Sequence, residues 1–184
     1  EKKIGESIEG VYAGISTRNI RIKEALPEVS LEEGKVRFKD YNKAIEKGKK
    51  MIELHEDEEI VDFITNFFIL DENPIFDSVI GWMGQRLKVN VTYFIGRKED
   101  VEKFKKVITN SGKVFKGYIL NIYSGKQVFL NGENSDGVRV LVDVGSGISD
   151  YIILKNGIIK EIGNVLVGGN NITNDLAICG EYSK

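Results

Sequence analysis

The chain has almost none of the residues that build disulfide frameworks and small metal centres. Its 184 residues include one cysteine, Cys179, and one histidine, His55. A disulfide within the chain needs two cysteines, and a zinc site made of Cys and His needs several such ligands, so both are excluded. A single cysteine is also typical of a protein from a reducing compartment.

Long apolar runs and an excess of one charge are missing as well. No segment reaches the ~18 consecutive apolar residues of a membrane-spanning helix, and no signal-peptide pattern is present. Lysine and arginine total 26 against 28 aspartates and glutamates, which gives a formal net charge of −2. This balance does not favour a nucleic-acid binder or a polybasic membrane face, so we expect no nucleic-acid partner.

The chain also lacks an initiating methionine and has only two prolines. It opens with EKKIGESIEG and stops at CGEYSK, shortly after a helical pattern begins, so we hypothesise that it is a fragment of a longer protein. Its length suits one domain or two small lobes. A hydrophobic content of 41% and a charged content of 29% are those of a soluble globular protein.

The first half of the chain predicts an α+β unit that ends near residue 96. Alternating apolar and polar residues indicate half-buried strands, and apolar residues at helical spacing indicate one helix. The expected elements are strands at 8–16, 19–25, 60–70 and 87–96, a helix over 40–54 with Asp40 as its N-cap, and an irregular excursion over 71–86.

The second half, from residue 97, has a different rhythm. An Asn-Gly pair at 156–157 lies between apolar strands, which is a strong signal for a hairpin. The expected elements are a helix over 98–111 with Gly112 just past its end, a strand at 115–123, a short helix capped by Ser124, strands at 138–144, 149–155, 158–163 and 164–167, and a final helix after Gly168-Gly169. We therefore divide the chain into 1–96 and 97–184.

The stretch LVDVGSGISDYII, residues 141–153, is the most informative motif. Asp143 stands at the end of one strand, and Gly145, Ser146 and Gly147 form a turn before the next strand. One interpretation is a tight structural hairpin with a capping aspartate. A dinucleotide-binding fingerprint is rejected, because it needs a helix after the turn and a hairpin follows here.

A third interpretation is a phosphate-binding hairpin turn. Glycines let main-chain N–H groups converge on an anion without a Cβ in the way. Asp143 would then hold a hydrated Mg²⁺ through water, since magnesium keeps several waters and takes few carboxylates. A P-loop at Ser124-Gly125-Lys126 is rejected, because Leu120 stands where its first glycine is required.

Residues 138–177 resemble the second phosphate segment of the actin-like ATPases, and most closely that of the FtsA-like cell-division proteins. The shared order is Asp-x-Gly-x-Gly on a hairpin, a third strand, a small residue with glycine, and a helix containing Asp175-Leu176-Ala177. Residues 8–16 resemble the strand that opens the extra subdomain of this family, and residues 82–112 resemble the junction where the chain leaves it.

The resemblance implies a fold, a ligand and partners. The fold would be α/β (α+β), made of partial actin-like (ribonuclease H-like) ATPase lobes with an FtsA-type inserted helix-and-sheet subdomain. ATP with Mg²⁺ would bind through the amides of Gly145, Ser146 and Gly147, with Asp143 on the metal through water. The implied partners are further copies of the protein and the tubulin-like division protein FtsZ. The implied location is cytoplasmic, at the inner face of the cell membrane, with contact through a segment outside this sequence.

Two departures from the family keep other functions open. Ile148 stands where members usually carry a threonine, and Ser146 stands where they often carry a third glycine. Loss of the threonine hydroxyl is expected to affect hydrolysis more than binding. The alternatives are a PilM-like or EutJ-like assembly protein on the same scaffold, and a nucleotide-independent protein-interaction module.

Three further residues are expected to be structural. Cys179 shares a helix face with Ile172 and Leu176, so it is expected to pack rather than react. Trp82 is expected in a satellite core beneath the 71–87 excursion, with a partner anchor as the alternative. His55 lies beside an acidic block and is expected at the surface.

Overall fold

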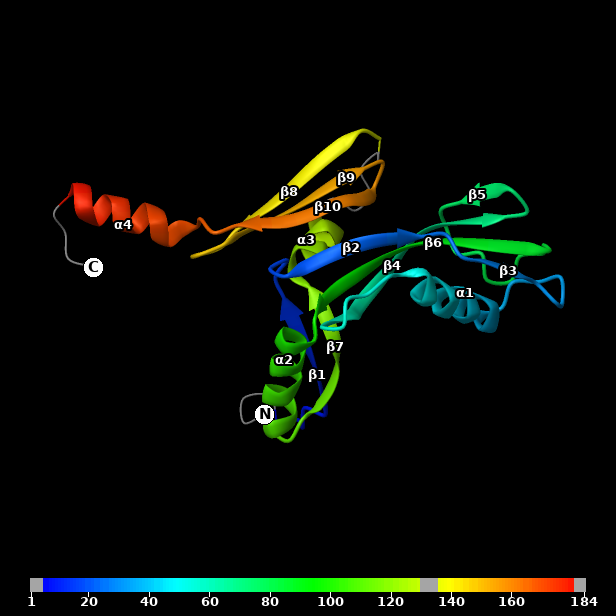
Figure 1. Ribbon diagram of the computed structural model, residues 1–184, viewed down its shortest axis with the longest axis horizontal. Helices are drawn as coiled ribbons and strands as arrows, with labels where there is room; N and C mark the ends of the chain where they lie inside the picture. The colour runs from blue at the N-terminus through cyan, green and yellow to red at the C-terminus, as the bar shows by residue number, and fades with distance from the viewer. Residues whose placement is uncertain (1–4, 130–135, 181–184) are drawn as a thin grey trace. The chain divides into compact units, whose positions relative to one another are not determined.

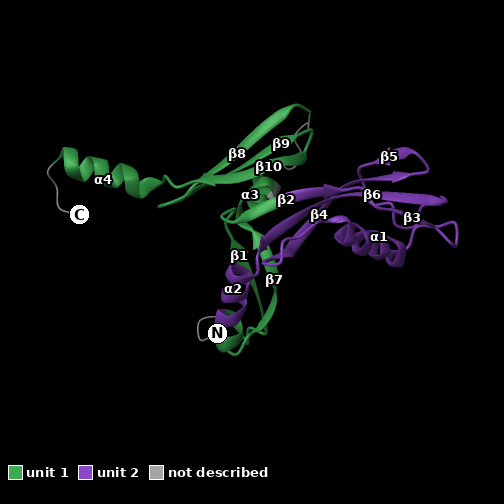
Figure 2. Cartoon of the chain, viewed as in Figure 1, with its two compact units in different colours: residues 1–21, 108–184 green, residues 22–107 purple. Residues whose placement is uncertain are grey.

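The computed structural model (Figure 1) describes residues 5–129 and 136–180, and it divides the chain into two compact units (Figure 2). One unit is residues 22–107, and the other joins residues 1–21 to residues 108–184. The sequence-based division into 1–96 and 97–184 differs from this grouping at both boundaries, which lie after residue 21 and after residue 107. Residues 1–21 group with the later half because their strand pairs there.

Residues 22–107 form an antiparallel sheet with a helix, α1, packed against it. The sheet order is β2-β6-β4-β5, and β3 also pairs with β6. Its elements are β2 (Ile20–Ala25), β3 (Glu28–Ser30), α1 (Phe38–Met51), β4 (Glu58–Leu70), β5 (Asn73–Ile75) and β6 (Arg86–Arg97). The predicted strands and helix of this half are therefore confirmed, and β5 adds a short strand inside the stretch expected to be irregular.

The core of this unit lies between α1 and β6. Alternate residues Val89, Val91 and Tyr93 of β6 are fully buried, as period-2 packing of one sheet face requires. The Tyr93 hydroxyl donates to the Ile45 carbonyl at 2.8 Å. A Cβ on Gly48 would overlap that hydroxyl, so glycine at this helix position permits the close approach.

The start of α1 differs from the sequence prediction. The helix begins at Phe38 with Arg37 as its N-cap, so the assignment of Asp40 as N-cap was wrong. Asp40 lies three residues further in, and its carboxylate accepts the Arg37 main-chain N–H at 3.0 Å. An acid at this position reaches back to the cap and satisfies a main-chain donor, as in a capping box.

The other unit pairs the first strand of the chain with a strand about one hundred residues later. β1 (Gly10–Ile15) runs parallel to β7 (Val114–Leu120). The helix α2 (Lys98–Asn110), most of which belongs to the unit of residues 22–107, precedes β7. Gly112 follows α2 with φ +74, as expected for a glycine just past a helix end. The helix α3 (Asn121–Phe129) follows β7.

The positions of Ser124 and of the Asn156-Gly157 pair test two further sequence predictions. Ser124 lies inside α3, where its hydroxyl donates to the Leu120 carbonyl at 3.4 Å, so its assignment as a cap was wrong. A three-stranded sheet of β8 (Val138–Val144), β9 (Ser149–Lys155) and β10 (Ile158–Val165) has the order β10-β9-β8. Asn156 and Gly157 both have positive φ between β9 and β10, which confirms the Asn-Gly turn.

Several apolar side chains are exposed within the described residues. The last helix, α4 (Gly169–Cys179), has no buried residue, so the packing expected for Cys179 is not found here. Trp82 is 51% exposed rather than in a satellite core, and His55 is at the surface as expected. Among the described helices, none is long and apolar enough to cross a bilayer.

Candidate functional site

The structure places the four predicted site residues together at one end of the β8–β9 hairpin. Asp143 is the last residue but one of β8, and residues 145–148 form the bend into β9. Asp143, Ser146 and Gly147 are exposed, and Gly145 is half-buried. The Gly145 N–H donates to the Ile148 carbonyl at 3.0 Å and closes the bend. A bend at the surface is open to a ligand.

The carbonyl side of the bend is held by the start of α4. The Gly169 N–H donates to the Gly145 carbonyl at 2.9 Å, and the Asn170 N–H donates to the Ser146 carbonyl at 2.7 Å. The first amides of a helix have no partner within it, so they are free for such contacts. A Cβ on Gly168 would lie 2.5 Å from the Gly145 carbonyl oxygen, so only glycine allows this approach.

These contacts fix the direction of the amides in the bend. All peptide bonds in the described structure are trans, and a trans peptide points its N–H opposite to its C=O. The Gly145 and Ser146 carbonyls face α4, so the Ser146 and Gly147 N–H groups face away from it. Within the described part of the chain, neither of these two N–H groups meets a protein acceptor. Two neighbouring donors are therefore held toward solvent.

Gly145 and Gly147 of the bend differ in whether the structure requires glycine at that position. A Cβ on Gly145 would lie 2.7 Å from the Ile148 carbonyl oxygen, so packing within the bend explains this glycine. Gly147 has no heavy atom within 4 Å of a built Cβ, and its φ is not positive. Neither steric overlap nor backbone strain therefore requires glycine at 147. A missing side chain here has the effect of leaving the adjacent amide accessible.

Sequence reasoning missed a buried polar contact on the same hairpin. Asp143 pairs across the ladder with Asp150, and opposite residues of an antiparallel pair share one face. Asp150 is only 6% exposed, and its Oδ1 accepts the Thr17 N–H at 3.2 Å and lies 2.7 Å from the Thr17 hydroxyl oxygen. That hydroxyl also donates to the Gly163 carbonyl at 2.6 Å.

The Thr17 contact joins the end of β1 to β9 and β10. Thr17 and Asp150 are 133 residues apart in sequence, so no local sequence pattern predicts that they meet. The only available signal was an acid at the start of an apolar strand. The described residues contain no group of three or more His, Cys, Asp or Glu side chains that could hold a metal ion, and Asp143 is a single exposed carboxylate.

Comparison with known proteins shows which fold the chain has. The family model of the SHS2 domain inserted in FtsA matches residues 18–95. The PilM–PilN type IV pilus biogenesis complex contains a chain of the same fold, with a TM-score of 0.54 at 15% identity. That alignment covers 95% of this chain and 48% of the other. The chain thus has a partial actin-like fold with an inserted SHS2 subdomain, as the sequence predicted.

Three curated relatives are all named cell division protein FtsA. Cell division protein FtsA of Neisseria meningitidis serogroup B is 31% identical over 92% of this chain, and that of Bacillus subtilis is 25% identical over 97%. FtsA of Helicobacter pylori is 24% identical over 90%. The chain spans 41%, 41% and 33% of the length of these relatives. Over nearly its whole length the chain is therefore similar to FtsA cell-division proteins, in agreement with the resemblance seen in the sequence.

Proposed function

We propose that this FtsA-like chain contributes the second phosphate-binding turn of a Mg-ATP site. The observation that supports this is the pair of N–H groups at Ser146 and Gly147, which face solvent because α4 engages the carbonyls beside them. Preorganised main-chain dipoles bind phosphate oxygens without reorganisation on binding. In this arrangement the two amides hold the terminal phosphates of the nucleotide.

Each neighbouring residue has a defined role in the proposed site. Gly147 leaves its amide uncovered, and Asp143 orders water on the magnesium that accompanies the phosphates. Magnesium bound this way would neutralise phosphate charge and orient the nucleotide. The exposed carboxylate and the open bend fit such a group, because no described residue other than Gly147 and its two chain neighbours has a heavy atom within 4 Å of a Cβ built on Gly147.

The proposed biological role follows the named relatives. We infer that the complete protein acts in cell division, self-associates, and links the tubulin-like protein FtsZ to the membrane through a segment outside this sequence. Support for the division role comes from the FtsA relatives alone. The fold neighbour from a pilus complex shares the scaffold, and its low identity carries only the fold.

Two substitutions test the nucleotide site in the complete protein. Asp143→Ala is expected to weaken Mg-ATP binding by roughly 10- to 150-fold, because a charge-assisted hydrogen bond contributes roughly 1.5–3 kcal/mol. Gly147→Val is expected to abolish binding at millimolar nucleotide while leaving the thermal unfolding midpoint unchanged, because its built Cβ meets no atom. Isothermal titration calorimetry measures Mg-ATP binding by both variants, and thermal unfolding checks that Gly147→Val keeps the unfolding midpoint of the unaltered protein.

Asp136→Asn is the matched control, since it removes an exposed acid at the far end of the same hairpin. Its affinity for Mg-ATP is expected to equal that of the unaltered protein. Unchanged binding in both Asp143→Ala and Gly147→Val would contradict the site. Absence of nucleotide binding by the unaltered protein, with partner binding retained, would favour the interaction-module alternative that Ile148 suggests.

A further inference from the structure

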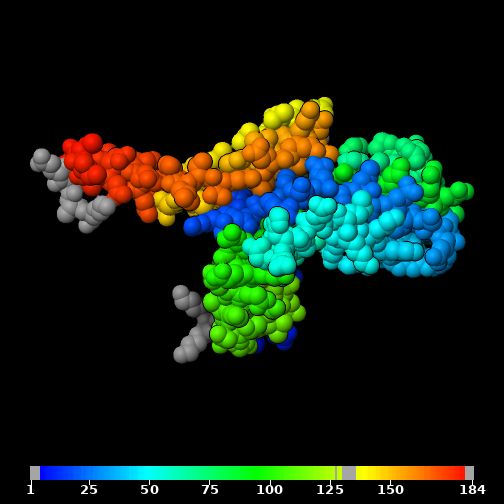
Figure 3. All heavy atoms as spheres, in the orientation of Figure 1, coloured from blue at the N-terminus to red at the C-terminus, as the bar shows by residue number. Residues whose placement is uncertain are grey.

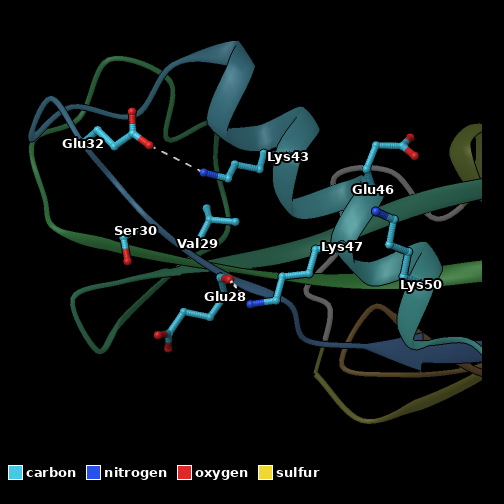
Figure 4. Close-up of a pocket in the computed structure, with 8 residues that line it drawn as sticks. All are labelled: Glu28, Val29, Ser30, Glu32, Lys43, Glu46, Lys47 and Lys50. Carbon is cyan, nitrogen blue, oxygen red and sulfur yellow. Dashed lines mark hydrogen bonds and ion pairs between the residues drawn. The ribbon is translucent and has the colours of Figure 1, made fainter.

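A shallow groove of about 460 Å³ lies between β3 and α1 in the inserted subdomain (Figure 4). The strand side is Glu28–Ser30, and the helix side carries three lysines. Figure 4 shows Lys43 and Lys47 extending from the helix toward the opposite wall. The lining residues are Glu28, Val29, Ser30, Glu32, Lys43, Glu46, Lys47 and Lys50.

The strand wall of the groove is a sheet edge, because among the described residues β3 pairs only with β6. Pro27 and Leu31 bond to β6, through Val89 N–H to the Pro27 carbonyl at 3.1 Å and Leu31 N–H to the Gln85 carbonyl at 2.8 Å. In an antiparallel pair, alternate residues bond to the partner and the others face away. The register Glu28↔Lys88 therefore turns the main-chain groups of Glu28 and Ser30 outward, into the groove.

One lysine already occupies an acceptor of this edge. Lys47 Nζ donates to the Glu28 main-chain carbonyl at 2.8 Å, and Figure 4 marks this bond. Lysine is a common means of protecting an open strand edge from pairing with another chain. The Lys47 ammonium group sits on a flexible stem, so an incoming main-chain donor can displace it and a carboxylate of the incoming segment can then pair with it.

The groove lining carries three lysines and three glutamates, and two of the glutamates pair with lysines outside the lining. Lys43, Lys47 and Lys50 lie four and three residues apart on one flank of α1, and all three are exposed. Lys43 has only a 3.7 Å ion pair with Glu32, both side chains being largely exposed, which is a weak contact. Within the described residues Lys50 meets no acidic partner. The two remaining acids pair with lysines outside the groove lining, Glu46 with Lys49 at 2.7 Å and Glu28 with Lys88 at 3.6 Å.

We propose that this groove binds an extended acidic segment of a partner protein as an added strand along β3. The incoming main chain donates to the Glu28 carbonyl in place of Lys47 and accepts the Ser30 N–H. Its acidic side chains pair with Lys43, Lys47 and Lys50. An open edge gives main-chain affinity, and a flanking helix gives side-chain selectivity, as in other strand-addition sites.

This docking surface lies in the inserted subdomain and does not depend on the Gly145–Gly147 bend. Selection of a random linear dodecapeptide library on the chain tests it, followed by fluorescence polarisation on single selected peptides. Enriched peptides are expected to be acidic with alternating apolar residues. Enrichment of basic peptides, or none above background, would overturn the proposal.

Two matched pairs of variants locate the binding. Ser30→Pro removes the outward N–H at an edge position where proline is tolerated, and it is expected to weaken a selected peptide at least tenfold. Ser30→Ala keeps that N–H and is expected to bind normally. Changing Lys43, Lys47 and Lys50 together to Gln is expected to weaken binding at least tenfold, whereas the same change at Lys103, Lys105 and Lys106 of α2 leaves it unchanged.

Circular dichroism confirms that each variant folds. Unaltered affinity in Ser30→Pro, or equal losses in the two lysine triples, would overturn the proposal. Co-sedimentation with vesicles of phosphatidylcholine containing phosphatidylserine tests a lipid surface as the occupant. Vesicle binding that the Lys43, Lys47 and Lys50 triple abolishes, together with no acidic peptide enrichment, would assign the lysines to a membrane and reject the strand-addition site.

Discussion

Single residues in this chain show two distinct uses of glycine. Gly48 is required by packing, because a Cβ there would overlap the Tyr93 hydroxyl. Gly147 is required by neither packing nor backbone conformation. The sequence shows both simply as glycines, so it can predict a turn at 145–147 and cannot separate a structural glycine from one that leaves room for a ligand.

Tyr93 makes stability depend on pH at the alkaline end. Burial, with smaller effects of the Glu46 and Tyr41 charges, raises the pKa of Tyr93 to about 12. Its pKa in the unfolded chain is about 10, so the unfolded state loses the proton first. The stabilisation is thus complete below pH 10 and is lost as the pH rises toward 12, by on the order of 2 kcal/mol.

Urea unfolding at pH 8, 10 and 11.5 measures this loss. Tyr93→Phe removes the titrating group and is expected to be less stable at pH 8, but to lose less stability between pH 10 and 11.5. The ionisation of the other tyrosines and of the lysines is common to both proteins. An identical pH dependence in the two would show that Tyr93 does not cause the alkaline loss.

At the scale of elements, the contact between α4 and the β8–β9 bend aims the proposed phosphate-binding amides. Gly168→Ala would put a Cβ 2.5 Å from the Gly145 carbonyl oxygen, so the helix must shift. We expect a loss of about 1–3 kcal/mol in stability, typical of overpacking, and weaker Mg-ATP binding in the complete protein. Chemical denaturation and calorimetry measure the two effects.

Gly169→Ala is the matched control for this prediction. Its nearest atom to a built Cβ is the Gly145 carbonyl oxygen at 3.9 Å, an ordinary contact. We expect near-normal stability and nucleotide affinity in that variant. If Gly168→Ala and Gly169→Ala behave alike, the close approach of α4 does not orient the bend.

Most elements could be predicted from the sequence, because their patterns are local. A high content of β-branched and aromatic residues predicted β4, alternation predicted β6, and the Asn-Gly pair predicted the turn after β9. Helix starts were predicted less well: Asp40 and Ser124 were taken as caps and lie inside their helices. Both side chains form hydrogen bonds with main-chain groups near the helix start, and residue type alone does not show at which residue the helix begins.

Long-range contacts at the candidate site could not be predicted. The position of Asp143 and the bend followed from the Asp-x-Gly-x-Gly order. The contact of Thr17 with Asp150 joins residues 133 positions apart, and the bonds from α4 to the bend depend on how two elements dock. Such contacts are set by tertiary packing, so neither the hydrophobic periodicity nor the secondary-structure propensity of the sequence predicts them.

At the scale of the whole molecule, the inserted subdomain distinguishes this chain from an actin-like lobe without an insertion. Its family model and the curated relatives agree on FtsA. We therefore expect the complete protein to retain an FtsZ-like protein in a pull-down and to leave pilus-assembly proteins in the supernatant. The reverse result would favour the PilM-like alternative. A protein with Gly147→Val distinguishes nucleotide-dependent capture from nucleotide-independent capture.

The parallel pairing of β1 with β7 has a consequence for synthesis on the ribosome. The register places Gly10 beside Val114, so the first strand emerges about one hundred residues before its neighbour. At roughly 5–20 residues per second, that delay is on the order of 5–20 s. Local contacts close faster than such distant ones. Nascent β1 therefore waits without its partner while the intervening subdomain matures first, and its early folding shortens the loop that the later pairing has to close.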